Sequence, residues 1–400
     1  MANSDLEVKI HSIALAQKSI DLICSGSIAA IESPRLIRAL RRLGAHVRPY
    51  LTDGGRQFIT PMALSWAANH QTVTEFSGTA PHIASGDALV VAPASASFIQ
   101  KIAHGVCDSP ASALAASYLG QKKRVLVLPN MHDSLFDAPA FQKNLATINP
   151  WVTILGGRLE EGKQKFPEPK VLADEIAHCL NNQEDYNILI SMGTTRGYVD
   201  DVRYFSNYSS GGLGTAIAEE AYRQGQKTHI VCGPCQIQPQ SYHQMIDITT
   251  NAELQDHCLK LMKHGMDSAV LASSVLDFIP KSRLSGKISS QDQLEVEFEK
   301  TQKIIPLINP ASGTKIGFKL EPNLNEDRCR DLAQDYMTKY NLSLMVLNDV
   351  HEVSKNTHKA TIFSRNNEVI SKEGEWSSKQ DIATVIINHT LQRKAQVSNP

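Results

Sequence analysis

Short apolar runs alternate with longer amphipathic stretches along this chain, and this alternation most constrains what it can fold into. In the first half, the runs IDLICSGSIAA, HVRPYLTD, DALVVAPAS and KRVLVLPN each end at a small or polar residue. Near-continuous apolar runs separated by helices are typical of a parallel sheet covered on both faces. The pattern therefore predicts an α/β fold with doubly wound, mainly parallel sheets.

The same pattern begins again after the polar stretch NNQEDY, residues 181–186, which we interpret as a linker. Strands are predicted in NILISMGTTRG, KTHIVCGP, SAVLASSVLDF, KIGFKLE and LSLMVLND, and a helix in GGLGTAIAEEAYRQG. We therefore predict two Rossmann-like domains in tandem, residues 1–180 and 187–400. Residues 281–303 are charged and poor in large apolar side chains, which predicts a mobile loop.

Local signals place the first helix and one cysteine. SPRLIRALRRLG predicts a helix with Ser33 as N-cap, Pro34 at its first position and Gly44 at its end. Cys107 falls in a helix-like segment and is expected to be buried in packing.

Charge and composition exclude several classes of partner. The 400 residues carry a formal net charge of −1, and no apolar run has the length of a membrane span. We therefore expect neither nucleic acid nor membrane as a partner. The N-terminus is too polar for a secretory signal, and the seven cysteines have no disulfide-framework spacing, which favours reduced thiols in the cytoplasm.

One pair of cysteines has a spacing that raises a separate question. Cys232-Gly-Pro-Cys235 has the spacing of a redox or metal-binding pair. No second pair lies nearby in the sequence, so a structural role is favoured over either of these functions.

The ends of the predicted strands carry small and hydroxyl residues, where ligands of open α/β sheets bind. In the first half these ends are Ser25-Gly26-Ser27, Thr52-Asp53, Pro93-Ala94-Ser95 and the segment 129–132. In the second half, Ser209-Ser210-Gly211-Gly212 comes directly before the predicted helix. Such a turn serves either as a tight connection or as a loop whose N–H groups bind an anion.

These stretches resemble two known enzyme families. The first family is the homo-oligomeric flavin-containing cysteine decarboxylases, whose opening resembles SGSIAAIESPRLIRALRRLG and the residues after it. Their PASANT region is similar to APASASFIQKIAHGVCDS, and their PxMNxxMW motif is similar to PNMHDSLF. The second family is phosphopantothenate–cysteine ligase, which is similar to this chain in the stretches GTTRGYVDDVRYFSNYSSGGLGTAIAEEA, ASSVLDFIP, GKI, IGFKLE and LND. Together they resemble the bifunctional bacterial enzymes of coenzyme A synthesis.

The resemblance implies a flavodoxin-like flavoprotein domain first and a ligase domain second. It implies ligation of phosphopantothenate with cysteine through an acyl-cytidylate, using CTP and Mg²⁺, followed by FMN-dependent decarboxylation of the product. It further implies a homo-oligomer, commonly a dodecamer.

Residue by residue, the resemblance assigns the ligase site. Arg203 and Asn207 match the family's VRYxSN residues, and Lys287 matches the first lysine of a KIKK stretch that reads KISS here. By the resemblance, the remaining CTP-site residues are Ser210, Gly211, Asp277, Phe318 and Asn348, with Asp277 also positioning the metal. From the residues alone, Arg203 could instead form a surface ion pair, and Asn207 a turn.

The resemblance also assigns the flavin site, with four departures from the family pattern. The expected FMN residues are Gly26, Ser27, Thr52, Ser95, Ala96 and Ser97. The family's base or orienting histidine lies eight residues before an aspartate, whereas His82 precedes Asp87 by only five. A short deletion, favoured by the local sequence PHI, gives this catalytic place to His82, and an alignment without a gap gives it to Thr79. PASANT reads PASASF, and His132 replaces the motif asparagine. The cysteine-bearing clamp is absent from residues 156–166, which leaves the proton donor of the reductive step open.

Two other functions compete with the two-activity enzyme. One is an active ligase whose flavin domain is impaired or structural. The other is a non-catalytic regulatory flavoprotein, against which the ligase motifs in the same chain argue. The choice between CTP and ATP also stays open.

Overall fold

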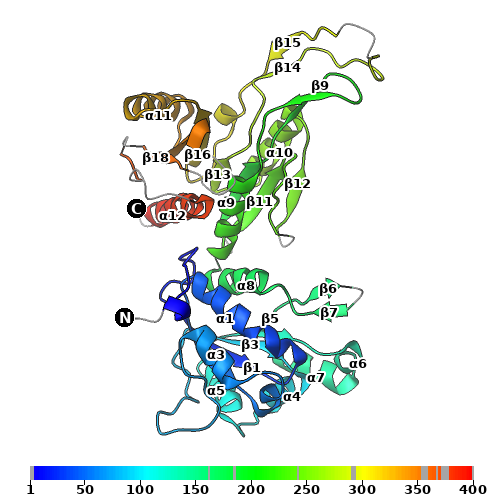
Figure 1. Ribbon diagram of the computed structural model, residues 1–400, viewed down its shortest axis with the longest axis vertical. Coiled ribbons are helices and arrows are strands. Elements are labelled where there is room, and N and C mark those ends of the chain that lie inside the picture. Colours follow the sequence, from blue (N-terminus) through cyan, green and yellow to red (C-terminus); the bar gives the residue numbers. More distant parts are fainter. Residues whose placement is uncertain are drawn as a thin grey trace. The chain divides into compact units, whose positions relative to one another are not determined.

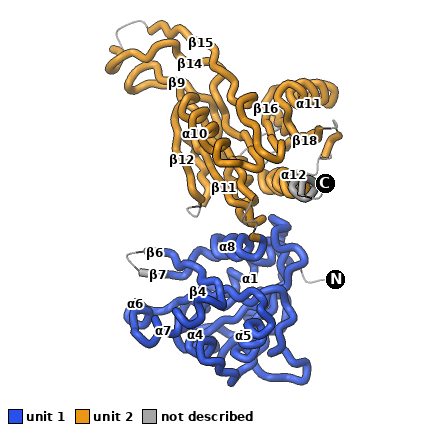
Figure 2. The backbone as a smooth tube through the Cα atoms, turned by 180° about the vertical axis from the view of Figure 1, so that it is seen from behind, with its two compact units in different colours: residues 1–181 blue, residues 182–400 orange. Residues whose placement is uncertain are grey.

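The computed structural model describes residues 4–160, 163–182, 186–240, 243–289, 294–352, 359–365, 368–370 and 378–398. The chain divides into two compact units, residues 1–181 and 182–400, shown in different colours in Figure 2. Residues 183–185 of the predicted linker lie outside the described part.

The first unit is built on a five-stranded parallel sheet in the order β2-β1-β3-β4-β5. Its strands are β1 (Ser19–Cys24), β2 (His46–Leu51), β3 (Ala88–Ala94), β4 (Arg124–Pro129) and β5 (Thr153–Ile154). This is the flavodoxin-like order, in which the chain reverses its direction of winding between β1 and β3. Both the fold class and the flavodoxin-like first domain are therefore confirmed.

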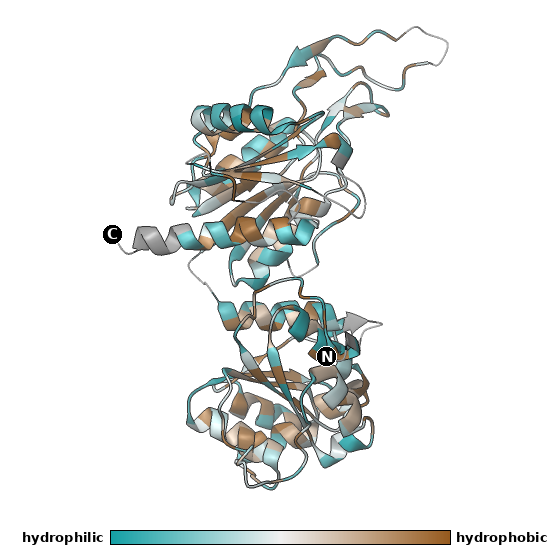
Figure 3. Ribbon diagram, turned by 60° about the vertical axis from the view of Figure 1, so that its left-hand side comes forward, coloured by the Kyte–Doolittle hydropathy of each residue, from teal (hydrophilic) through white to brown (hydrophobic). Residues whose placement is uncertain are grey.

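Helices cover both faces of this sheet because successive strand residues face opposite sides. On β1, Leu22 packs with α1 (Ser33–Arg42), α3 (Pro61–Ala68) and α8 (Pro169–Asn181). The next residue, Ile23, packs on the other side with α4 (Ala96–His104), α5 (Pro110–Gly120) and α7 (Pro139–Ile148). Figure 3 shows the resulting apolar strands inside and polar residues on the outer helix surfaces.

Shorter elements complete this unit and correct two expectations. They are η1 (Ser4–Leu6), η2 (Ile28–Glu32), α2 (Asp53–Arg56), α6 (Asp133–Phe136), and the hairpin of β6 (Arg158–Glu160) with β7 (Lys163–Lys165). Ser33 is not an N-cap, because η2 runs directly into α1, and its hydroxyl instead donates to the carbonyl of Ala92. Cys107 is not buried in a helix either; it is exposed in the loop that follows α4.

The second unit contains a seven-stranded sheet in the order β12-β11-β8-β13-β16-β17-β18. The strands are β8 (Asn187–Met192), β11 (Lys227–Cys232), β12 (Met245–Asp247), β13 (Ser268–Leu271), β16 (Thr314–Glu321), β17 (Leu344–Asp349) and β18 (Thr361–Ser364). The strand pairs are parallel except for β18, which is antiparallel to β17. One face packs on α9 (Gly212–Arg223) and α12 (Lys379–Ser398), the other on α10 (Asn251–Lys263) and α11 (Glu326–Tyr340).

Two antiparallel ribbons project from this sheet, as Figure 1 shows. One joins β9 (Arg196–Tyr198) to β10 (Tyr204–Ser206), and the other joins β14 (Phe278–Pro280) to β15 (Phe298–Lys300). The mobile loop predicted for 281–303 is therefore wrong at residues 298–300, which form a strand; its residues 290–293 lie outside the described part. Short 3₁₀ turns occur at η3 (Ile305–Leu307) and η4 (Val350–Glu352).

Among the described residues, we find no helix whose length and hydropathy would allow it to cross a membrane.

Candidate functional site

The carboxyl edge of the first sheet is ordered by a network of serine hydroxyls. After β1, the Ser25 hydroxyl donates to the Pro93 carbonyl at 2.8 Å and accepts the backbone N–H of Ser95 at 2.7 Å. The turns that follow β1 and β3 are thereby held together at the point where the strand order reverses. This is the position at which a sheet of this kind binds its ligand.

Glycines allow the turns after β1 and β2 to touch. A Cβ added to Gly26 would lie 3.1 Å from the backbone carbon of Gly54, so a side chain there would push the two turns apart. Thr52 caps the short helix α2, because its hydroxyl accepts the N–H of Gly55 at 3.2 Å. The sequence singled out Gly26 and Thr52, and both lie in this pair of turns.

The remaining small residues line the same edge. The Ser27 hydroxyl donates to Oδ1 of Asn130, after β4, at 2.7 Å. Ser95 caps α4, and Ala96 and Ser97 form the first turn of that helix. These contacts bring together residues from the ends of β1, β3 and β4.

His132 lies beyond β4 as the exposed N-cap of α6. Its Nδ1 atom accepts the backbone N–H of Ser134 at 3.2 Å. When the imidazole is neutral, this contact assigns the ring proton to Nε2, which leaves an N–H donor on the outer side of the ring.

His82 lies in the segment between α3 and β3. Its ring packs edge-on against Phe76, with the centroids 5.4 Å apart. Its Nδ1 atom is buried and has no hydrogen-bond partner within the described part of the chain. Thr79, the alternative position, bonds to Ser77 through its hydroxyl at 2.8 Å.

In the second unit, the glycine-rich turn before α9 is tightly packed. Gly211 has a φ of +78°, and a Cβ added to it would lie 2.6 Å from Cβ of Cys235. The N–H of Gly212 donates to the Ser210 hydroxyl at 3.3 Å. The positive φ and the close packing against Cys235 therefore both require a glycine at position 211.

One residue near this turn has no signal in the sequence. A Cβ added to Gly212 would lie 3.3 Å from Nζ of Lys379, at the start of α12. More than 160 residues separate the two in the chain, so only the packing of α12 against α9 brings this ammonium group to the helix N-terminus.

Arg203 is held at the tip of the β9–β10 ribbon. Its guanidinium donates to Asp200 at 2.8 Å and to the backbone carbonyl of Ile288 at 3.1 Å. Burial disfavours the charge of Asp200, but the N–H groups of Arg203, Val202 and Ile288, together with the guanidinium charge, outweigh it and lower the pKa of Asp200 to about 2. Asp200 was quoted in the VDDVRY motif but not recognised as the residue that positions Arg203.

The segment that carries Lys287 is bound to the same ribbon. Asp201 accepts the N–H of Gly286 at 2.8 Å, and Arg283 donates to the other oxygen of that carboxylate at 2.8 Å. Lys287 is exposed and directly precedes Ile288, whose carbonyl binds Arg203. The sequence-predicted Arg203 and Lys287 thus lie on segments that are hydrogen-bonded to each other.

Asn207 and Asp277 lie near the end of β13. The Asn207 amide donates to the carbonyl of Val275 at 3.2 Å. Asp277 forms an ion pair with Lys303, with 2.5 Å between Oδ1 and Nζ. Leu276, between Val275 and Asp277, donates its N–H to the Thr195 hydroxyl at 3.1 Å, which ties this loop to the end of β8.

Phe318 and Asn348 lie on neighbouring strands. Phe318 is half-buried on β16 and packs against the core that α9 and α12 cover. Asn348 is buried at the end of β17, and its Oδ1 atom has no partner in the described part of the chain. The next residue, Asp349, accepts the N–H groups of His351 and Leu324, which lower the pKa of its carboxyl.

Among the described residues, no group of three or more histidine, cysteine or acidic side chains could hold a metal ion.

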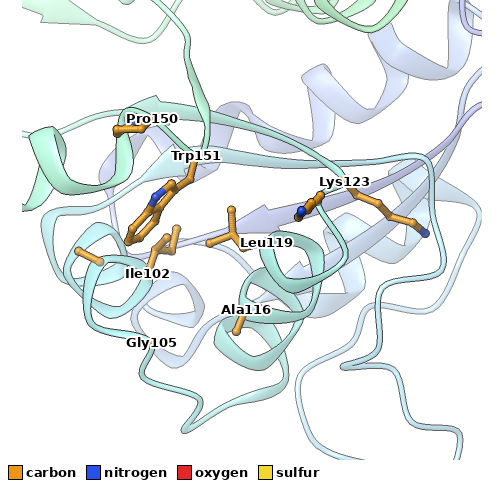
Figure 4. Close-up of a pocket in the computed structure, with 9 residues that line it drawn as sticks. Ile102, Gly105, Ala116, Leu119, Lys123, Pro150 and Trp151 are labelled. Atoms are coloured by element: carbon orange, nitrogen blue, oxygen red, sulfur yellow. The ribbon is translucent and has the colours of Figure 1, made fainter.

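A pocket lies on the first unit, lined by the ends of α4, α5 and α7. This pocket of about 650 Å³ includes Ile102, Leu119, Lys123 and Trp151 (Figure 4). Lys123 directly precedes β4, so the pocket lies at the amino edge of the sheet and is separate from the serine network.

Comparison with known proteins places both units. The family model for the C-terminal domain of the DNA/pantothenate metabolism flavoproteins matches residues 183–393, just over half of the chain. The chain belongs to the DNA/pantothenate metabolism flavoprotein family. A second model, described as flavoprotein, matches residues 9–181 and identifies the first unit of this family member as a flavin domain.

Relatives of this flavoprotein extend over both units. It is 29% identical to the coenzyme A biosynthesis bifunctional protein CoaBC of Thermococcus kodakarensis, over 88% of this chain and 90% of the relative. It is also 29% identical to the protein of that name from Escherichia coli K12, over 85% and 88%. Among solved structures, it is similar to the C-terminal domain of a CoaBC protein at 22% identity and a TM-score of 0.43, covering 54% of this chain and 98% of that one.

Proposed function

We propose that this protein makes 4′-phosphopantetheine for coenzyme A in two steps. The second unit ligates 4′-phosphopantothenate with L-cysteine, and the first unit decarboxylates the product. The observation that carries the proposal is the tandem order of the two family matches, residues 9–181 and 183–393, on a chain whose bifunctional relatives are covered to about nine-tenths of their length.

In the ligase step, the substrate carboxylate is first activated as an acyl-nucleotidylate, and the amine of cysteine then displaces the nucleotide. Both steps build negative charge on oxygen, which cations and N–H donors stabilise. Arg203 is suited to this role because Asp200 and the Ile288 carbonyl fix its guanidinium while 37% of its side chain stays exposed. Asn207, directly after β10, supplies an amide N–H donor.

The nucleotide is expected to bind along the ends of β8, β13, β16 and β17. Lys287 reaches the triphosphate, and Ser210 and Gly211 contribute the turn before α9. The unpartnered Oδ1 of Asn348 supports a base or ribose site, because a buried acceptor needs a donor such as the amino group of cytosine. Phe318 supplies an apolar surface beside it.

Asp277 does not fit a resident magnesium ion, since Lys303 already occupies one of its carboxylate oxygens. Magnesium usually binds through substrate phosphates and only one or two carboxylates. A magnesium ion would therefore arrive with the phosphates of the nucleotide.

The serine network fits FMN. Gly26 and Thr52 hold the turns after β1 and β2 close together, and Ser95, Ala96 and Ser97 place only small side chains at the start of α4. Ser27 contributes a hydroxyl at the same edge. The flavin supplies reversible two-electron oxidation of the cysteinyl thiol.

Two histidines then act on the substrate. His82 serves as the base or orienting group, which its buried and unpartnered Nδ1 supports. His132, whose Nδ1 is occupied by Ser134, presents Nε2–H to the substrate carboxylate.

One alternative has an observation in its favour. The exposed N-cap position of His132 and the missing clamp cysteine are what an active ligase with an impaired flavin domain would show. The two functions differ in whether phosphopantothenoylcysteine is decarboxylated, and so in the release of CO₂.

The deciding experiment supplies purified protein with phosphopantothenate, cysteine and CTP. We expect flavin absorbance, formation of phosphopantothenoylcysteine, and release of CO₂. Ligation without CO₂ release would favour the alternative, and ATP in place of CTP tests the choice of nucleotide. A cytoplasmic homo-oligomer, of the dodecameric type found in this family, completes the proposal.

A further inference from the structure

The cysteine pair after β11 lies against the glycine-rich turn. The sulfur atoms of Cys232 and Cys235 are 3.7 Å apart. Cys232 ends the strand and is buried, whereas Cys235 is half-buried in the loop that follows. The two thiols therefore touch each other, and one of them can be reached by a small reagent.

The same loop supports the residues before α9. The N–H of Ile237 donates to the carbonyl of Ser210 at 2.9 Å, and the Thr215 hydroxyl donates to the carbonyl of Ile237 at 3.0 Å. A Cβ on Gly211 would lie only 3.0 Å from Sγ of Cys235. Because no free space separates the thiols from this turn, a rearrangement of the loop must also move the turn.

We propose that Cys232 and Cys235 form a reversible disulfide by exchange with a soluble low-molecular-weight disulfide, and that this modification distorts the turn at Ser210–Gly212. The first part rests on the thiol geometry alone. The second part rests on the proposed function, because that turn belongs to the proposed ligase site.

The exchange balances with the soluble disulfide as the oxidant. The Cys235 thiolate attacks one sulfur of that disulfide, forms a mixed disulfide and releases one thiolate. The Cys232 thiolate then attacks Sγ of Cys235 and displaces the second thiol. Two protein thiols are oxidised by two electrons, and the soluble disulfide is reduced to two thiols. Only Cys235 needs access to solvent.

The hydrogen bond between the thiols supports this order of attack. This contact, in which either thiol can be the donor, lowers the pKa of Cys235 below its ordinary value and raises the pKa of Cys232. Since the thiolate is the nucleophile, Cys235 reacts first.

A metal is the competing occupant of a pair with this spacing. Structural zinc sites use four ligands. Asp247 lies opposite Cys232 on β12, but no group of three or more histidine, cysteine or acidic side chains in the described part of the chain could hold a metal ion. The dithiol interpretation is therefore favoured, and zinc binding is measured as an outcome of the test.

The test equilibrates the full-length protein in buffers of oxidised and reduced glutathione, followed by alkylation and peptide mass spectrometry. We expect a linked Cys232–Cys235 peptide, two fewer alkylated thiols, and a ligation rate that falls roughly 10- to 100-fold in parallel. Dithiothreitol should restore both readouts.

Variants separate the parts of the proposal. Cys235→Ser should abolish the link and the sensitivity of ligation to oxidation, and Cys232→Ser should leave a mixed disulfide on Cys235. Cys107→Ser, which removes an exposed cysteine from the other unit, should change neither readout. The proposal is overturned if Cys232 and Cys235 both remain free for alkylation in a glutathione buffer that converts Cys107 to a mixed disulfide. Zinc bound to the pair would also overturn it, as would a Cys232–Cys235 disulfide that forms without slowing ligation. Absence of ligation in reduced protein would instead overturn the proposed function, and the linked peptide would still report on the disulfide.

Discussion

At the residue scale, the ligase proposal depends on side chains that are held by backbone contacts on neighbouring loops. Arg203 and Asn207 are separated by four positions, yet one is bound to the carbonyl of Ile288 and the other to that of Val275. Each is thus fixed between the β9–β10 ribbon and a second segment, which suits a residue that must meet a substrate in one orientation.

Asn207→Asp should abolish most of the ligation, because a carboxylate replaces an N–H donor where negative charge develops. We expect kcat for ligation to fall by roughly 10²–10³, measured as phosphopantothenoylcysteine formed. Flavin absorbance and decarboxylation of supplied phosphopantothenoylcysteine are the internal control and should not change. Ligation at the original rate would remove Asn207 from the site.

Lys287→Gln should raise KM for CTP by about 10-fold or more, since a charge-assisted contact to phosphate is worth roughly 1.5–3 kcal/mol. Lys281→Gln is the matched control on the same segment, because Lys281 is paired with Glu297 at 2.9 Å. Equal effects of the two substitutions on KM would mean that Lys287 acts only through the general charge of the segment.

At the element scale, Asp200 joins the ribbon to segment 286–288. Its pKa of about 2 lies below the ordinary 3.8, so its ionised form stabilises the folded state above about pH 4, and this stabilisation is lost as the pH falls toward about 2. We expect the protection of the Val202 and Ile288 amides, measured as the intrinsic exchange rate divided by the observed rate, to fall across that range. Asp200→Asn should already show fast exchange at pH 7, whereas Asp256→Asn, at an exposed pair on α10, should not.

The contact between α9 and α12 contains a buried ionic cluster. Arg223 is 2% exposed and binds Glu219 at 2.9 Å and Glu220 at 3.4 Å, and Gln380 of α12 donates to Glu220 at 2.9 Å. Removing the cation from buried carboxylates usually costs about 3–5 kcal/mol.

Arg223→Leu should therefore lower the thermal unfolding midpoint of the second unit strongly, measured by calorimetry on the full chain. Lys260→Leu, which breaks an exposed pair with Asp256, should cost less than about 1 kcal/mol. Similar shifts for both variants would show that the cluster contributes no more than a surface pair.

At the scale of the whole molecule, the two units have separate cores and separate proposed sites, so their activities should be separable. His82→Asn should block decarboxylation and spare ligation, the reverse of Asn207→Asp. A mixture of the two variants should release CO₂ from phosphopantothenate, cysteine and CTP, since the intermediate passes through solution. No CO₂ from the mixture, with each single activity present, would mean that the intermediate does not leave the chain.

The two sheets and most of their strands could be predicted from the amino-acid sequence. Apolar runs such as IDLIC and NILISM predicted β1 and β8 because burial on both sheet faces requires apolar side chains at successive positions. The short strands of the ribbons were missed, since a strand of three residues is too short to show a periodic pattern. Ser33 was misplaced because nothing local signals that η2 continues into α1.

Which residues meet depends on tertiary packing. The motifs named Arg203, Asn207 and Lys287, but the contact of Arg203 with the carbonyl of Ile288 follows from how two ribbons pair. Lys379 lies beside Gly212, and Cys235 contacts the glycine-rich turn. Both contacts join segments that are separated in the chain. The physical reason is that local propensity and hydrophobic pattern act over a few residues, whereas a site is assembled by packing among helices, sheets and loops whose spacing in the sequence is arbitrary.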